Sequence, residues 1–119
     1  LVHGVWTEAA WAHLLANATT FANLHKQCNS NASTRPLETF RLSKLLSAQA
    51  LVFSESAHPA DEAEFEGMVS FTPSSTMAKE FDRVSGMAPH KRVQLARSRA
   101  ATFAARFAPK SILKRAGIF

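Results

Sequence analysis

The last 36 residues of the chain, 84–119, carry eight basic residues and no acidic residue. Within them Arg92, Arg99 and Arg106 recur at intervals of seven residues, and so do the apolar residues that follow each of them. Such spacing keeps side chains near one side of an α-helix, because seven residues fall just short of two turns. The pattern therefore predicts a C-terminal helix with a narrow apolar face and an adjoining cationic face.

Composition extends the helical prediction to the rest of the chain. Ala and Phe are abundant, Tyr is absent, and Ile occurs only at positions 112 and 118. Ala and Leu favour helix, and a shortage of Ile and Tyr disfavours sheet. We therefore expect an all-α fold of three to four helices in one domain or subunit, 1–119, with a basic C-terminal helix and a short tail.

Local signals set the expected helix boundaries. Thr7 is a suitable N-cap, Pro36 and Pro89 suit first helical positions, and Gly86 suits a C-terminal cap. The expected elements are helices over 7–22, 36–56, 76–86 and 89–107, a short acidic helix over 60–67, and a loop over 70–75. Because Pro109 should end the basic helix, residues 108–119 are expected to form a basic and apolar docking tail.

Charge is distributed unevenly along the chain, whose net charge is +5. Residues 61–83 hold six acidic against two basic residues, and the basic excess lies after them. A polarised charge distribution of this kind is typical of a surface that meets a charged partner. The acidic segment is expected to be solvated or to pair with the basic helix.

The basic segment supplies the candidate binding residues. Arginine suits phosphate contacts because its guanidinium is planar and always charged, and a Phe ring can stack on an unpaired base or enter a lipid headgroup layer. The alternative is that the apolar side chains are core and the arginines a solvated face. The anion-binding candidates are Lys91, Arg92, Arg97, Arg99, Arg106, Lys110, Lys114 and Arg115, and the stacking or interface candidates are Phe103, Phe107 and Phe119.

Metal and catalytic signatures are weak. The stretch 62–67 resembles the opening of a calcium-binding loop, but its twelfth position is Pro73, where a bidentate Glu is needed. His25 and Cys28 provide two ligands where a zinc site needs four. Gly is too rare, at four residues, for a phosphate-cradling loop. We therefore predict no metal, no cofactor and no enzymatic activity.

Few features of the sequence bear on the cellular compartment of the protein. Cys28 is alone, so no intrachain disulfide can form, which favours a reducing, intracellular location such as a mitochondrion or another organelle. No apolar run is long enough to span a membrane. Whether a targeting segment was removed before Leu1, and whether the sequons at Asn17 and Asn31 are used, is left open by the sequence.

These features lead to a hypothesis about partners. We expect a non-catalytic structural subunit of a large assembly, surrounded by other protein subunits and docked through its C-terminal helix on an anionic surface. Ribosomal RNA, and hence a ribonucleoprotein, is the favoured surface. The alternative is a peripheral subunit of an organellar membrane complex that contacts lipid headgroups or acidic protein. A small enzyme with an unrecognised site is the remaining possibility.

Overall fold

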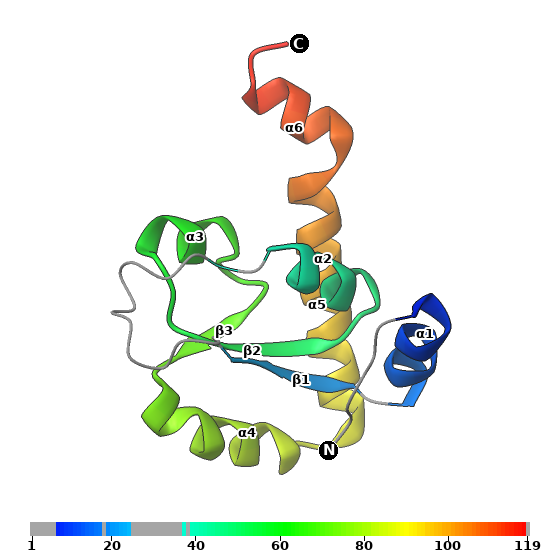
Figure 1. The fold of residues 1–119 in the computed structure, drawn as a ribbon, viewed down its shortest axis with the longest axis vertical. Helices are drawn as coiled ribbons and strands as arrows, with labels where there is room; N and C mark the ends of the chain where they lie inside the picture. The colour runs from blue at the N-terminus through cyan, green and yellow to red at the C-terminus, as the bar shows by residue number, and fades with distance from the viewer. Residues whose placement is uncertain (1–6, 18, 25–36, 38, 119) are drawn as a thin grey trace.

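A three-stranded parallel sheet lies at the centre of the chain, so the all-α prediction is wrong (Figure 1). The computed structural model describes residues 7–17, 19–24, 37 and 39–118. The strands β1 (Thr20–Asn23), β2 (Leu51–Glu55) and β3 (Ser70–Thr72) lie side by side in sequence order. Asn23 is opposite Ser54, and Glu55 is opposite Thr72, so the carboxyl ends of the strands share one edge of the sheet.

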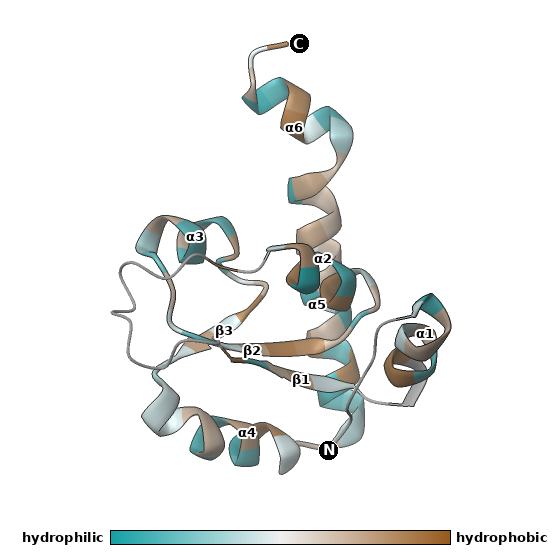
Figure 2. Cartoon of the chain, viewed as in Figure 1, coloured by the Kyte–Doolittle hydropathy of each residue, from teal (hydrophilic) through white to brown (hydrophobic). Residues whose placement is uncertain are grey.

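The central strand β2 explains the incorrect prediction. All five of its residues are buried, and Figure 2 shows it as one of the most hydrophobic stretches of the chain. A short apolar run covered on both faces has no polar alternation, so its composition alone does not separate it from a buried helix. The sequence prediction extended the preceding helix through this run, whereas the helix ends at Ser47.

The part of the chain that the structure describes also contains six α-helices and one 3-10 helix. Figure 1 shows α2 and α3 on one face of the sheet, α4 on the other, and α5 running past it. These elements are α1 (Glu8–Asn17), α2 (Thr39–Ser47), α3 (Pro59–Glu64), η2 (Ser74–Thr76), α4 (Met77–Ser85), α5 (Pro89–Phe107) and α6 (Pro109–Arg115).

Two apolar clusters form the core, one on each face of the sheet. Val52 packs with the buried leucines of α2, while Leu51 and Phe53 pack with Val84 of α4. This division follows from the alternation of side chains along a strand. Helix α5 contributes Ala96 to the second cluster and Phe103 to the first, so it crosses a sheet edge and joins both layers.

The predicted caps and helix boundaries agree with the structure better than the predicted fold class does. The N-cap is confirmed by a bond from the Ala10 amide to Thr7 Oγ1 at 3.1 Å. The expected helices over 76–86 and 89–107 are confirmed by α4 and α5, and the short acidic helix by α3. The first helix ends at Asn17, where 7–22 was expected, and the expected loop over 70–75 contains β3 and η2. Beyond Pro109 the expected tail contains α6.

Candidate functional site

Half of the eight basic residues of the C-terminal segment make contacts within the chain. Arg99 Nη2 donates to Ser70 Oγ at 2.9 Å, at the amino end of β3. Glu64 Oε2 lies 3.4 Å from both Arg106 Nη2 and Arg115 Nη1. The expectation that the acidic segment pairs with the basic helix is therefore confirmed for Arg106, whereas Arg115, the second partner of Glu64, lies beyond that helix.

Arg99 is the most enclosed cation of this segment. Burial lowers the pKa of its guanidinium, and the positive charge of Arg83 acts in the same direction, while Glu80 opposes both. Its Nη1 atom is buried without a hydrogen-bond partner. An unpartnered buried donor costs free energy, so Arg99 does not belong to a freely solvated stripe.

Other basic side chains face outward. Lys91, Arg97, Lys110 and Lys114 are exposed, and within the described residues none of them has an ion pair or side-chain hydrogen bond. Arg92 is half-buried and donates from Nη1 to the Ser85 carbonyl at 3.2 Å. The seven-residue recurrence of arginines thus does not define one uniform cationic face.

Two of the aromatic candidates, Phe103 and Phe107, are partly buried against the core. Phe107 stacks on Phe65 with ring centroids 5.3 Å apart and contacts Phe103 at 5.1 Å. The Arg115 guanidinium lies over the Phe107 ring, 5.7 Å from its centroid. Both rings pack α5 against the core cluster that contains Val52 and the leucines of α2. Phe119 lies outside the described residues.

A polar cluster that the sequence analysis did not single out lies at the carboxyl-terminal edge of the sheet. Asn23 and Ser54 are buried side by side, with Asn23 Nδ2 donating to Ser54 Oγ at 3.0 Å. Arg41 Nη1 of α2 donates to Asn23 Oδ1 at 2.9 Å. These three residues come from three different elements, so only the folded chain brings them together.

Glu55 extends this edge toward the opposite face of the sheet. It is the last residue of the central strand and 6% exposed, and Ser74 Oγ of η2 donates to its Oε1 at 2.5 Å. The hydroxyl groups of Thr72 and Thr76 share a hydrogen bond of 2.7 Å beside it. We call Asn23, Arg41, Ser54, Glu55 and Ser74 the carboxyl-edge cluster. Its sequence signal is the polar Ser-Glu pair that ends an apolar run.

The described parts of the chain contain neither a group of potential metal ligands nor a membrane-spanning helix. There, no group of three or more His, Cys, Asp or Glu side chains is arranged to hold a metal ion. The pair His25 and Cys28 and the sequon residue Asn31 lie outside the described residues. Within the described ranges, no helix has both the length and the apolar character needed to cross a bilayer.

Comparison of the chain with protein-family models, with curated proteins and with solved structures finds no significant match. The geometry therefore defines a class of unit, a parallel α/β sheet with a buried polar cluster at its carboxyl edge.

Proposed function

We propose that the chain is a ligand-binding α/β unit that holds the hydroxyl groups of a sugar or nucleoside at the carboxyl-terminal edge of its sheet. The observation that carries this proposal is the position of Glu55, a carboxylate at the end of the central parallel strand. Open parallel sheets bind ligands outside the carboxyl ends of their strands, and an acidic side chain there can accept hydrogen bonds from ribose hydroxyls.

The neighbouring side chains fit a ligand rich in hydroxyl groups. Ser74 orients the Glu55 carboxylate, and Thr72 and Thr76 supply further groups that both donate and accept hydrogen bonds. The four glycines of the sequence lie at 4, 67, 86 and 117, so none falls between β1 and β2, where a dinucleotide-binding sheet carries its phosphate loop. Recognition through hydroxyls is therefore favoured over a glycine-rich phosphate cradle.

The test is a binding titration followed by NMR, with adenosine, uridine, their 2′-deoxy analogues and glucose as probes. We expect one or more of the hydroxyl-rich probes to shift the amide signals of Ser54 and Glu55. We expect Glu55→Gln to weaken that binding by about tenfold or more, because hydrogen bonds to a charged group are worth about 1.5–3 kcal/mol.

Glu66→Gln is the matched control, since Glu66 is an exposed glutamate and not part of the cluster. It should leave the affinity unchanged. If no probe shifts the carboxyl-edge signals, or if Glu55→Gln binds as well as the unaltered chain, the proposal is wrong.

A second candidate is the docking role predicted from the sequence, in which the chain is a non-catalytic subunit of an intracellular assembly and its basic segment contacts RNA. The observation that favours it is the set of outward-facing cations on α5 and α6, Lys91, Arg97, Lys110 and Lys114. Phosphate contacts by such side chains give sequence-independent affinity that falls with salt.

Titration with a single-stranded oligoribonucleotide tests this role. Replacing Lys91, Lys110 and Lys114 with Gln should make the slope of log affinity against log salt shallower by about 0.7 for each lost contact. Arg99→Gln is the comparison, and it should lower stability with little effect on the slope. An unchanged slope in the lysine variant would exclude RNA docking through this face, and binding only to anionic vesicles would favour the membrane alternative.

A further inference from the structure

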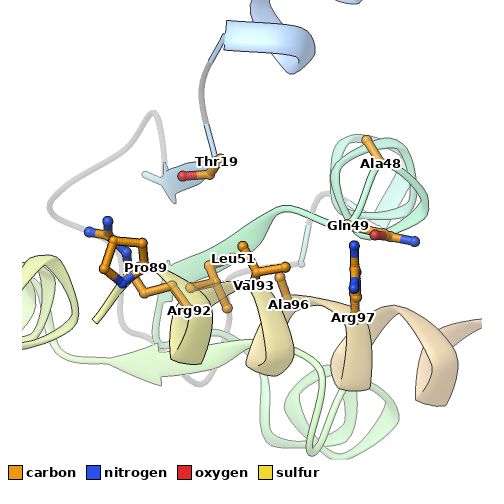
Figure 3. Close-up of a pocket in the computed structure, with 9 residues that line it drawn as sticks. All are labelled: Thr19, Ala48, Gln49, Leu51, Pro89, Arg92, Val93, Ala96 and Arg97. Atoms are coloured by element: carbon orange, nitrogen blue, oxygen red, sulfur yellow. The ribbon is translucent and has the colours of Figure 1, made fainter. Parts of the chain in front are cut away.

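A cavity of about 300 Å³ lies at the opposite, amino-terminal edge of the sheet (Figure 3). It is bounded by the first turns of α5, by Thr19 before β1, and by Leu51 at the start of β2. Its volume is at the lower end of the range for small-molecule sites, about 300–1,000 Å³. Leu51, Val93 and Ala96 lie at the centre of the view and give the cavity an apolar floor.

Among the described residues, two arginines and no acidic residue line this cavity. Arg97 is exposed and has no ion pair or side-chain hydrogen bond among the described residues, and Arg92 is bonded to a backbone carbonyl. The amino end of α5 adds a partial positive charge from the helix dipole. Guanidinium groups without carboxylate partners beside an apolar floor favour an anion that carries an apolar body.

The backbone of Gln49 places an amide side chain beside this cavity. Its φ angle is 59°, in the left-handed region that favours glycine. It follows α2 in a Schellman-type end, in which the amide of Ala50 donates to Leu45 and that of Gln49 donates to Leu46. Glycine would fit this position with less strain. The chain instead has an amide side chain here, which lines the cavity. The Arg97 side chain points toward it (Figure 3).

Val93 adds a third observation. Its side chain is 44% exposed although it lies on the floor of the cavity. A ligand with an apolar body would cover this surface. The exposed Val93 side chain, the two cations and the strained Gln49 thus surround the same space.

We infer that this cavity binds a phosphate monoester of a small organic molecule. The phosphate group lies against Arg97, beside Gln49 at one side of the cavity, because a guanidinium fork matches phosphate oxygens and pairs with them through charge-assisted hydrogen bonds. The organic part of the ligand lies on Val93 and Leu51. The Gln49 amide donates to the ligand at the rim.

The experiment is an NMR titration of the full chain with phenyl phosphate, inorganic phosphate and phenol. We expect phenyl phosphate to bind more tightly than either of the other two and to shift the amide signals of Thr19, Gln49 and Val93. Arg97→Gln should weaken binding by about tenfold or more. Arg92→Gln should weaken it less, because the Arg92 guanidinium lies at the other side of the cavity and donates to the Ser85 carbonyl. Lys110→Gln and Glu55→Gln are controls that should bind phenyl phosphate normally, so this site is tested separately from the carboxyl-edge cluster.

Gln49→Gly separates binding from folding. We expect it to raise the melting temperature by about 2–6 °C, because the left-handed backbone no longer carries a side chain, and yet to weaken phenyl phosphate binding. Phenyl phosphate that binds no better than phenol, or an Arg97→Gln variant that binds normally, would overturn the site. A Gln49→Gly variant with unchanged affinity would contradict the assignment of Gln49 to it.

Discussion

Arg99 in α5 donates a hydrogen bond to Oγ of Ser70, the first residue of β3, across a separation of 29 residues. The bond holds a positively charged side chain in a partly buried position, where burial lowers its pKa. A residue that the seven-residue recurrence assigned to a docking face therefore contributes to the tertiary structure. The contribution of this hydrogen bond to the free energy of unfolding can be measured directly.

We expect Ser70→Ala to destabilise the chain more than Arg99→Met does. The serine variant leaves a buried guanidinium with one partner fewer, which costs about 1–3 kcal/mol. The methionine variant loses the bond but also removes the buried Nη1 atom that has no partner, so the two effects partly cancel. Urea denaturation measures both. Arg97→Met, at an exposed position, is the control and should change stability by less than about 0.5 kcal/mol.

Two phenylalanines that the sequence placed on the same helix should differ sharply in their effect on stability. Phe53 is 1% exposed in β2 and packs against Phe81, whereas Phe40 in α2 is 76% exposed. We expect Phe53→Ala to cost about 3–5 kcal/mol and Phe40→Ala less than about 1 kcal/mol. Thermal or chemical denaturation measures the loss of stability in each variant. Equal costs would mean that β2 is not the central strand.

The contact between Glu64 and the two arginines should hold α6 against α3 without contributing much to global stability. Both ion pairs are solvent-exposed and measure 3.4 Å, and such pairs are worth about 0–1 kcal/mol. Glu64→Gln should therefore leave the denaturation midpoint nearly unchanged but accelerate hydrogen exchange at the α6 amides. Glu66→Gln serves as the comparison, and faster exchange in that variant as well would show that the effect is not specific to these pairs.

Glu80 should make a small pH-dependent contribution to stability. Its hydrogen bond with Arg83 holds the pKa of the carboxyl below its usual value of 4.5, with burial acting weakly in the opposite direction. Because the folded pKa is depressed, the contribution is present above pH 4.5 and is lost as the pH falls through the folded pKa. Glu80→Gln should lose less stability than the unaltered chain between about pH 5 and pH 3. Identical pH profiles would refute this coupling.

The carboxyl-edge cluster was not predicted because the sequence gives no information on which segments become neighbours. Asn23 and Ser54 are 31 residues apart, and their hydrogen bond exists only because β1 and β2 pair in parallel. Assigning residues 51–55 to a helix placed Glu55 on a helix surface, where it has no special position. Recognition of β2 as a strand would have placed Ser54 and Glu55 at a carboxyl edge and indicated a site.

The sequence by itself determined the local features of this protein. Pro89 begins α5 and Thr7 caps α1, as the sequence predicts, because these effects act over a single turn. The tertiary structure alone decided that residues 51–55 form the central strand, that Arg99 and Arg106 face partners within the chain, and that Glu55 lies at the sheet edge. Strand pairing and burial depend on contacts between distant segments, and an apolar run acquires its conformation from the surfaces that cover it.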